Sequence, residues 1–486
     1  MSNSIANLDP KILWKHFYSL TQIPRPSKHE QAAVDFVVKF GKDLGLETIV
    51  DEVGNVIIRK AATPGMENRK GIILQGHLDM VPQKNNDKQH DFEKDPIEAF
   101  VDGEWVTANG TTLGADNGIG VAAAMAVLED NSLVHGPIEA LFTIDEETGM
   151  TGAFNLKPGL LKGDILMNLD SEDEGELYVG CAGGMDANIK LAYKEESTPA
   201  GYSFVKLSVT GLKGGHSGMD ISSGRGNSIK LLFRFLRYAE KQFHIRLASI
   251  DGGSLRNAIP REAFAVVGVP ADKLSELEQA AKKHLEIFKA EFSKVEPDMA
   301  FSVDKIDAPK SVFDAKAQWG IIRGVFGCPN GVIRMSDAMP GLVETSTNLA
   351  RVYSEDGFIY VQCLLRSSVD TAKEALGEKI ASVFEMAGAE VSFAGSYPGW
   401  KPNMDSAILK VMGEVYKANW GKTPEIKAIH AGLECGILGG VYPNLDMISF
   451  GPTIRYPHSP DEKVKIDTVD KFWKFLVEVL KNAPQK

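Results

Sequence analysis

The sequence has little cysteine, and this excludes two kinds of small-protein scaffold. Only 4 of its 486 residues are cysteine, at positions 181, 328, 363 and 435. They are scattered and form no CxxC pair, so we expect neither a zinc ribbon nor a disulfide framework. A reducing cytoplasm is therefore the expected location of the chain.

Long apolar runs and an excess of positive charge are also missing. The run GVAAAMAVL (120–128) is far shorter than the ~20 residues of a membrane span. The first residues show no basic segment followed by an apolar stretch, so we expect no signal peptide. Lysine and arginine number 53 against 65 aspartate and glutamate, which gives a net charge of −12. Such a surface repels phosphate groups, so we expect neither a nucleic-acid nor a membrane partner.

What is present is ordinary globular composition, with 43% apolar and 24% charged residues. At roughly 100–200 residues per domain, the length predicts two or three domains. Residues 1–184 alternate short apolar runs with helical patterns, which is typical of a mostly parallel sheet. We expect a helix within 6–45 and a helix at 117–130, and strands at 55–60, 71–80, 138–145 and 163–170.

The pattern changes between residues 185 and 397. Strands that alternate polar and apolar residues, and amphipathic helices, predict an α+β domain long enough for two βαβ-type halves. The expected strands are 204–212, 263–270 and 358–368, and the expected helices are 227–241, 271–295 and 371–388. An α/β pattern returns with a helix at 405–421, a strand at 445–452 and a helix at 469–483. We therefore predict an α/β domain formed by 1–184 and 398–486, with a mixed sheet, interrupted by an inserted α+β domain at 185–397.

Side chains that commonly bind metal ions follow several of the predicted strands. They are His77, Asp116, Glu147, Asp170 and His458. In open α/β sheets, ligands bind at the carboxyl ends of the strands. Imidazole and carboxylate without thiolate suit Zn²⁺, Mn²⁺ or Co²⁺. Two histidines and three carboxylates exceed the needs of one tetrahedral ion, but they suit two ions ~3.5–4 Å apart that share a bridging carboxylate.

Two further acids accompany these candidates. Asp79 follows His77 by two residues, so both side chains share one face of an extended strand and Asp79 can orient the imidazole. Glu146 precedes Glu147, and one carboxylate of such a pair can bind metal while the other takes a proton from water. Singly, these residues have simpler explanations: a helix N-cap for Asp116, a solvated face for the glutamates and an exposed loop for His458. Their joint occurrence at strand ends favours the metal centre.

Six motifs occur in the order in which they occur in a known family. They are GHLDMVP (76–82), GADNGIG (114–120), DEETGMTGA (145–153), NLDSE (168–172), KGGHSG (213–218) and HSPDE (458–462). On these motifs, nearly the whole chain resembles the co-catalytic zinc metallopeptidases, a family that includes aminoacylases, carboxypeptidase G, peptidase T and carnosinases. GHLDMVPQKN, LNLDSEDEGE and IHAGLECG are most similar to the aminoacyl-histidine dipeptidases within that family.

The resemblance implies a role for each candidate. His77, Asp116 and Asp170 would hold one divalent ion, and Asp116, Glu147 and His458 a second, with Asp116 bridging. Zinc is the expected metal, with cobalt or manganese as alternatives. Asp79 would orient His77, and Glu146 would be the general base. The α/β domain would then be catalytic, and the inserted domain would be a lid.

The resemblance also implies substrate-binding residues in or near the lid. His216 would stabilise the tetrahedral oxyanion, Arg366 would clamp the C-terminal carboxylate of the substrate, and Asn257 would make a polar contact. Without the resemblance, GGHSG indicates only a glycine-rich turn. Glu434 in HAGLECG, near His430, is open between a substrate contact, a supporting group and a loop charge.

The implied activity is hydrolysis of small peptides, specifically dipeptides with a free N-terminus such as Xaa-His and β-Ala-His. A broader di- or tripeptidase and an N-acyl amino-acid deacylase are alternatives on the same scaffold. A non-catalytic binding protein is disfavoured because Glu146, Asp79 and all five ligands are present. A Rossmann-type nucleotide enzyme is disfavoured because no strand leads through GxGxxG into a helix. The large lid leaves open whether the chain is a homodimer and whether one chain completes the site.

Overall fold

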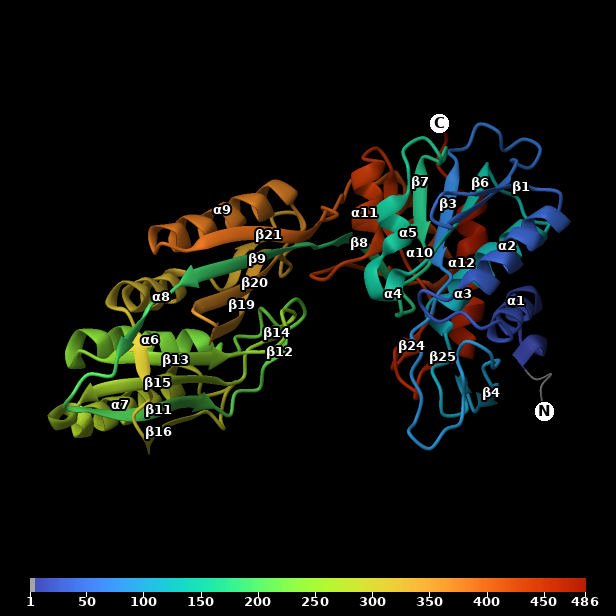
Figure 1. Ribbon diagram of the computed structural model, residues 1–486. Helices are drawn as coiled ribbons and strands as arrows, with labels where there is room; N and C mark the ends of the chain where they lie inside the picture. The colour runs from blue at the N-terminus through green and yellow to red at the C-terminus, as the bar shows by residue number, and fades with distance from the viewer. Residues whose placement is uncertain (1–4) are drawn as a thin grey trace. The chain divides into compact units, whose positions relative to one another are not determined.

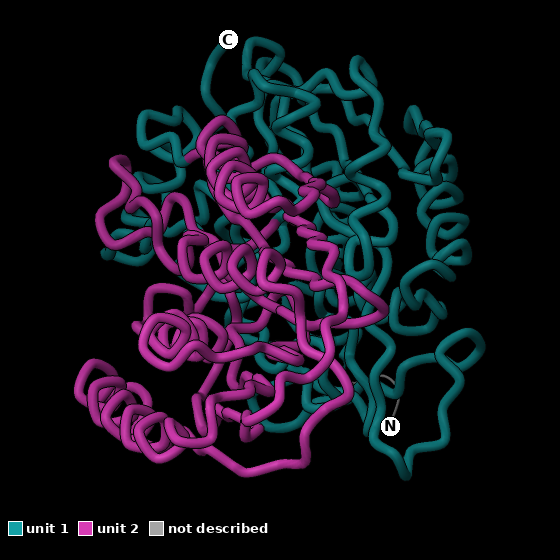
Figure 2. The backbone as a smooth tube through the Cα atoms, turned by 60° about the vertical axis from the view of Figure 1, so that its left-hand side comes forward, with its two compact units in different colours: residues 1–180, 402–428, 433–486 teal, residues 181–401, 429–432 magenta. Residues whose placement is uncertain are grey.

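The computed structural model describes residues 5–486, which form two units (Figure 2). Unit 1 comprises Met1–Gly180, Pro402–Ala428 and Leu433–Lys486, and unit 2 comprises Cys181–Lys401 and Ile429–Gly432. The domain assignment with boundaries at 184 and 397 stays a prediction. The structure adds that the short segment 429–432 groups with unit 2 although it lies far along the chain from the rest of that unit.

Unit 1 contains an eight-stranded sheet in the order β1-β2-β6-β3-β7-β23-β8-β22 (Figure 1). Its strands are β1 Glu47–Val50, β2 Val56–Lys60, β3 Ile72–His77, β6 Ile138–Thr143, β7 Ile165–Asn168, β8 Glu176–Cys181, β22 Glu425–Ile429 and β23 Asp446–Ser449. The four central strands β6, β3, β7 and β23 are parallel, whereas β1, β2 and β8 pair antiparallel. The predicted mixed α/β fold is therefore confirmed.

The central strands of unit 1 are apolar throughout because both of their faces are covered. Every residue of β3, β6 and β7 is buried, as is typical of parallel strands between helices. The helices are α1 Lys11–Thr21, α2 Gln31–Asp43, α3 Ala115–Glu129, α4 Glu146–Gly149, α5 Thr151–Asn155, α10 Ala407–Trp420, α11 Glu434–Val441 and α12 Ile466–Lys481. The single helix expected within 6–45 is thus two helices, α1 and α2.

A smaller sheet of unit 1 frames the loop that carries His458. Its order is β24-β25-β5-β4, with β4 Ala99–Asp102, β5 Trp105–Ala108, β24 Ile454–Arg455 and β25 Lys463–Lys465. The antiparallel pair β24–β25 brackets residues 456–462. This loop therefore projects from a sheet whose other strands come from the first quarter of the chain.

Unit 2 contains a nine-stranded sheet built from two halves with the same order of elements. One half runs β11-α6-β13-β15-α7-β16 and the other β9-α8-β19-β20-α9-β21. Their strand orders, β16-β11-β15-β13 and β21-β9-β20-β19, are equivalent, and β13 pairs with β19 to join them. The strands are β9 Gly183–Ala192, β11 Tyr202–Thr210, β13 Arg246–Gly252, β15 Ala263–Pro270, β16 Ala300–Ile306, β18 Gly331–Met335, β19 Val343–Glu355, β20 Phe358–Ser367 and β21 Glu390–Tyr397.

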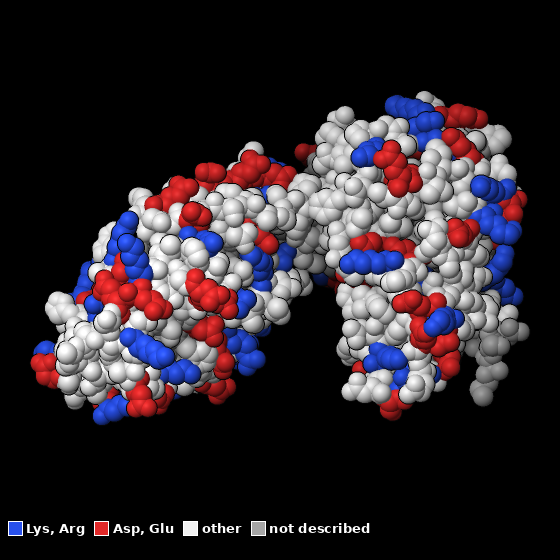
Figure 3. All heavy atoms as spheres, viewed as in Figure 1, with Lys and Arg blue, Asp and Glu red and all other residues white. Residues whose placement is uncertain are grey.

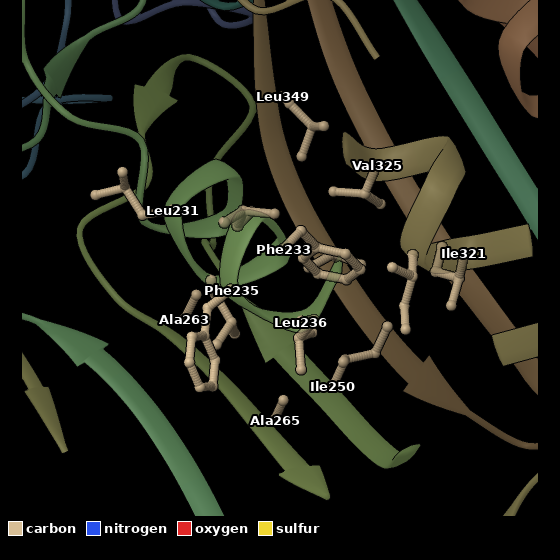
Figure 4. Packing of buried hydrophobic residues seen from close by; sticks show 14 of the residues in the cluster. Leu231, Phe233, Phe235, Leu236, Ile250, Ala263, Ala265, Ile321, Val325 and Leu349 are labelled. Atoms are coloured by element: carbon tan, nitrogen blue, oxygen red, sulfur yellow. The ribbon is translucent and has the colours of Figure 1, made fainter. Parts of the chain in front are cut away.

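Four helices cover one face of this sheet and enclose its core. They are α6 Ser228–Phe243, α7 Leu274–Glu291, α8 Ala315–Gly327 and α9 Asp370–Met386. Phe233 and Leu236 of α6 pack with Ile321 and Val325 of α8 and with Leu349 of β19 (Figure 4). One core therefore spans both halves, which agrees with the predicted α+β character.

The surface shows no dominance of one charge in the view of Figure 3, where basic and acidic side chains are interspersed over both units. Among residues 5–486, no helix combines the length and the apolar character needed to cross a membrane.

Candidate functional site

The five predicted metal ligands meet at the carboxyl edge of the central strands in unit 1. His77 ends β3, and Asp170 lies two residues beyond β7. The Nε2 atom of His77 lies 3.1 Å from Asp116 Oδ1 and 3.5 Å from Asp170 Oδ1. The Nε2 atom of His458 lies 3.3 Å from Asp116 Oδ2 and 2.9 Å from Glu147 Oε2. Two groups of three donors therefore form, His77–Asp116–Asp170 and Asp116–Glu147–His458.

Asp116 belongs to both groups through different oxygen atoms. Its Oδ1 faces His77 and its Oδ2 faces His458. This position follows from local backbone geometry, because Asp116 has φ −81° and ψ 111° and so interrupts the first turn of α3. The carboxylate consequently points out of the helix instead of capping it.

The residues present fit a pair of divalent ions. Donors bound at ~2.0–2.1 Å to one tetrahedral ion lie ~3.3 Å apart, which is close to the histidine–carboxylate distances of 2.9–3.5 Å in the two groups. Glu147 Oε1 and Asp170 Oδ1 are buried and have no hydrogen-bond partner among the described residues. Buried carboxylate oxygens are costly unless something pairs with them. The donor set contains only imidazole nitrogen and carboxylate oxygen, which suits zinc, cobalt or manganese.

The electrostatics of this cluster reflect the crowding of carboxylates. Hydrogen bonds to Asp116 and Glu147 raise the pKa of His458 to about 11. Burial opposes the charging of His77, but Asp170 and Asp116 still raise the pKa of His77 well above its ordinary value. Burial and the neighbouring carboxylates raise the pKa of Asp170 to about 7. The isolated cluster therefore carries excess negative charge and retains protons to offset it.

Asp79 fixes the positions of His77 and of the backbone that carries Glu146 and Glu147. Its carboxylate lies 3.3 Å from Nδ1 of His77, which leaves Nε2 facing the other ligands. The same carboxylate accepts the backbone N–H groups of Glu146 at 3.0 Å and Glu147 at 3.2 Å, and the hydroxyl of Ser27. Burial opposes ionisation, but the His77 contact and these donors lower the pKa of Asp79 to about 2. Asp79 is thus a charged anchor for two adjacent segments.

Glu146 has the environment expected of a general base. Burial raises its pKa well above the ordinary glutamate value, and the charges of Asp170, Glu434 and Glu147 add to that effect against the opposing charge of His77. A carboxylate with a raised pKa is a better base and can both take and return a proton. Glu146 begins α4, directly after β6 and Asp145.

His216 and Asn257 come together in unit 2. His216 lies on β12 Gly215–His216, which pairs with β14 Ala258–Ile259, and Asn257 directly precedes β14. The Asn257 carbonyl accepts the N–H of Ser217. The Nδ1 atom of His216 accepts the N–H groups of Gly218 and Met219, both at 3.1 Å. Burial and the charge of Arg366 lower the pKa of His216. The ring is therefore neutral, and its proton resides on Nε2, where it can be donated.

Arg366 near the end of β20 is buried and forms no ion pair with an acidic side chain among residues 5–486. Only 6% of it is exposed, its Nη1 lies 3.4 Å from the Tyr397 hydroxyl, and its Nε has no hydrogen-bond partner among the described residues. Asp186 of the neighbouring strand pairs with Arg256 instead. Burial and Arg366 lower the pKa of His430, in the segment that joins unit 2, to about 4. This cluster therefore favours an anion.

Glu434 lies in unit 1 and is buried, so it is not a solvated loop charge. Its Oε2 accepts hydrogen bonds from the side chains of Gln75 on β3 and Thr143 on β6. Gln75 in turn accepts from Asn168 on β7. Glu434 thus belongs to a polar network that crosses the parallel strands close to the ligands.

Several contributing residues were missed in the sequence. Ser27, Gln75 and Tyr397 carry no local pattern that distinguishes them from other polar residues. Glu462 lies within HSPDE, a motif that was recognised for His458 alone. Its carboxylate contacts the segment that leads to Asp116, and only the resemblance between motifs could have drawn attention to it.

Comparison with known proteins identifies a family profile and two relatives that match this chain. The profile of peptidase family M20/M25/M40 matches residues 73–482. The chain is 48% identical over 484 residues, covering 100% of both sequences, to the cytosol non-specific dipeptidase of Escherichia coli strain K12. It is 50% identical to the aminoacylhistidine dipeptidase of Vibrio alginolyticus, whose crystal structure matches with a TM-score of 0.97 over 100% of both chains.

A more distant structure shares the fold alone. The aminopeptidase PepT of Bacillus cereus matches with a TM-score of 0.61 at 18% identity, over 98% of both chains. The family profile spans most of the chain, and near-half identity extends along its full length to two peptidases. With the ligand geometry of unit 1, these likenesses show that the chain is a metallopeptidase of peptidase family M20/M25/M40.

Proposed function

We propose that the protein hydrolyses dipeptides with a free N-terminus, Xaa-His dipeptides among them, with two divalent metal ions. The observation that carries the proposal is Asp116, whose two oxygens face two separate donor groups beside the buried Glu146. The names of the Escherichia coli and Vibrio alginolyticus relatives, a dipeptidase and an aminoacylhistidine dipeptidase, support the substrate class.

His77, Asp116 and Asp170 would hold one ion, and Asp116, Glu147 and His458 the other. Zinc fits these donors best, and cobalt or manganese fits as well. When bound, the ions would supply a water of lowered pKa and polarise the scissile carbonyl.

Glu146 takes the proton of the attacking water and returns it to the leaving amine. Its raised pKa suits both transfers. Asp79 fixes the backbone N–H groups of Glu146 and Glu147, so that the base and a ligand keep their spacing. Glu434 stays a candidate substrate-binding residue, and its buried contacts with Gln75 and Thr143 support a role beside the ligands.

Unit 2 supplies the groups for substrate binding. Arg366 has an unused guanidinium edge, which suits the planar C-terminal carboxylate of a dipeptide. His216 offers its Nε2–H to the oxyanion that develops during attack. Asn257 adds a polar contact next to His216. A clamp on the carboxylate would restrict the length of the substrate and disfavour longer peptides.

We also propose that a single chain supplies all of these substrate-binding residues, without a contribution from a partner subunit. His216 lies in one half of unit 2 and Arg366 in the other, yet the Arg366 charge lowers the pKa of both His216 and His430. A homodimer stays a prediction, as does a cytoplasmic location, which the name of the Escherichia coli relative supports. A monomer in light scattering with full activity would establish that no partner subunit is needed.

The substrate proposal is tested with zinc-loaded protein and an equimolar panel. The panel contains β-Ala-His, Gly-His, Gly-Leu, Gly-Gly-His and N-acetyl-His, with a chelator-treated control. We expect chelator-sensitive release of amino acids from the dipeptides, while Gly-Gly-His and N-acetyl-His stay intact. Faster cleavage of N-acetyl-His would establish the deacylase alternative, and cleavage of Gly-Gly-His a broader di- and tripeptidase. Intact dipeptides would refute the proposal.

A further inference from the structure

Glu462 holds the backbone that leads to the shared ligand Asp116. Its Oε2 accepts the N–H groups of Leu113 at 2.8 Å and Gly114 at 3.0 Å. Its Oε1 accepts those of Ala115 at 2.7 Å and Asp116 at 3.2 Å. One carboxylate thus binds four consecutive amides at the start of α3, where the helix dipole also favours negative charge. Glu462 itself is 2% exposed.

Arg25 also hydrogen-bonds the segment that leads to Asp116. Its guanidinium donates to the carbonyls of Leu78 and Asp79, which follow His77, and to the carbonyl of Gly114. Gly114 has φ +71°, and a Cβ there would lie 2.5 Å from Arg25 Nη2. Glycine is therefore required at this point, and the backbone before Asp116 is clamped between a buried cation and a buried carboxylate.

The two metal-ligand groups depend differently on Glu462. His77 ends β3 and Asp170 lies two residues beyond β7, and these strands pair directly, so the sheet itself sets their spacing. His458 has no such support, because it lies in the loop between β24 and β25 with 51% of its side chain exposed. Glu462 closes this loop four residues later and binds it to the Asp116 segment. Thr107 of β5 also donates to the Glu462 carbonyl.

We propose that Glu462 is a positioning residue that sets Asp116 against His458, and so controls the affinity of the second ion, held by Asp116, Glu147 and His458. The inference rests on the proposed function, since it requires a two-ion site. The first ion, held by His77, Asp116 and Asp170, depends on Glu462 less. Loss of a group that orients a ligand commonly weakens metal binding by about 10- to 100-fold. This weakening falls on the affinity for the second ion.

The test compares Glu462→Gln with Glu139→Gln. Glu139 is a matched control, because its buried carboxylate also accepts two backbone amides, those of Lys162 and Gly163, both at 2.7 Å. It lies near the start of β6, at the opposite end of the strand from Glu146. Each metal-free variant is titrated with Co²⁺, with visible absorption and calorimetry as readouts, and thermal unfolding is followed in parallel.

We expect Glu139→Gln to bind each of the two ions with the same affinity as the wild-type protein does. Glu462→Gln should retain the first ion and bind the second about 10- to 100-fold more weakly. Two ions of wild-type affinity in Glu462→Gln, or equal weakening of both, would overturn the positioning role. A wild-type protein that does not bind a pair of ions would instead refute the proposed function.

If Glu462→Gln does not fold, Glu462→Asp replaces it in the same titration. This variant keeps the charge but shortens the reach by one methylene. Selective weakening of the second ion supports the inference, and unchanged or uniform affinities refute it.

Discussion

Opposite electrostatic surroundings distinguish the histidines of the two candidate clusters, His77 and His458 in unit 1 and His216 and His430 in unit 2. In unit 1, carboxylates raise the pKa of His458 to about 11 and that of His77 well above its ordinary value. In unit 2, burial and Arg366 lower the pKa of His216 and bring that of His430 to about 4. An imidazole is therefore poised to carry charge in the unit 1 cluster and to stay neutral in the unit 2 cluster.

The difference shows what each cluster lacks. In the unit 1 cluster, carboxylates surround His77 and His458, and buried carboxylate oxygens lack hydrogen-bond partners among the described residues. This cluster therefore favours the binding of cations. Unit 2 gathers neutral imidazoles around a buried guanidinium, so it calls for an anion and for an acceptor opposite a ring N–H. A dipeptide offers both features in its carboxylate and in the oxyanion formed during hydrolysis.

Removing the shared carboxylate should have the largest effect on the unit 1 cluster. Asp116→Ala deletes a donor from both groups, so we expect neither ion to be retained and peptide hydrolysis to fall to background. Metal content after gel filtration and the turnover of Gly-His measure the two losses. Asp130→Ala, which alters the other end of α3, is the control and should retain both. Full metal content in Asp116→Ala would remove that residue from the centre.

Replacing the base should separate chemistry from metal binding. Glu146→Ala should lower kcat by about 10²- to 10⁴-fold, the usual contribution of a positioned acid or base, with two ions still bound. The measurements are steady-state kinetics and metal analysis of the same preparation. A variant that keeps most of its kcat would show that another group accepts the proton.

Altering the unit 2 cluster should change substrate binding but leave metal binding intact. Arg366→Ala should lower kcat/KM for Gly-His by roughly 10- to 100-fold, because hydrogen bonds to a charged group contribute ~1.5–3 kcal/mol. The loss should be much smaller for the amide of Gly-His, which lacks the carboxylate. Arg351→Ala is a control from the adjacent strand β19, where Arg351 stacks on Tyr353. Equal losses for both substrates would contradict the carboxylate clamp.

The smallest expected effect is the release of protons when the cluster of unit 1 binds metal. Without metal, His458 with its pKa of about 11 is protonated at pH 7, so metal binding must displace that proton. We expect proton release on zinc binding and weaker zinc binding as the pH falls from 8 to 6. Calorimetry in buffers of different ionisation enthalpy measures the release. His430→Gln should not change it, because His430 is already neutral in this range. Absence of proton release would show that the cluster binds metal without displacing the His458 proton.

Much of unit 1 was predictable because its signals are local. Apolar runs identified β2, β3, β6 and β7, and parallel strands bring their carboxyl ends to one edge. His77 and Asp170 could therefore be placed together from sequence. The pairing of β13 with β19 in unit 2 was less accessible. β19 contains many small polar residues, and this pairing joins distant parts of the chain.

By itself, the sequence determined the alternation of elements, the candidate ligands and the acids beside them, since side-chain periodicity and strand ends are properties of neighbouring residues. Only the tertiary structure decided which atoms meet. It brought the two oxygens of Asp116 next to different histidines and buried Glu434 against Gln75. It also left Arg366 without an ion pair to any described acidic residue. Glu462 binds the amide of Gly114 across 348 residues. Such a contact depends on how the whole chain folds, and no local pattern encodes it.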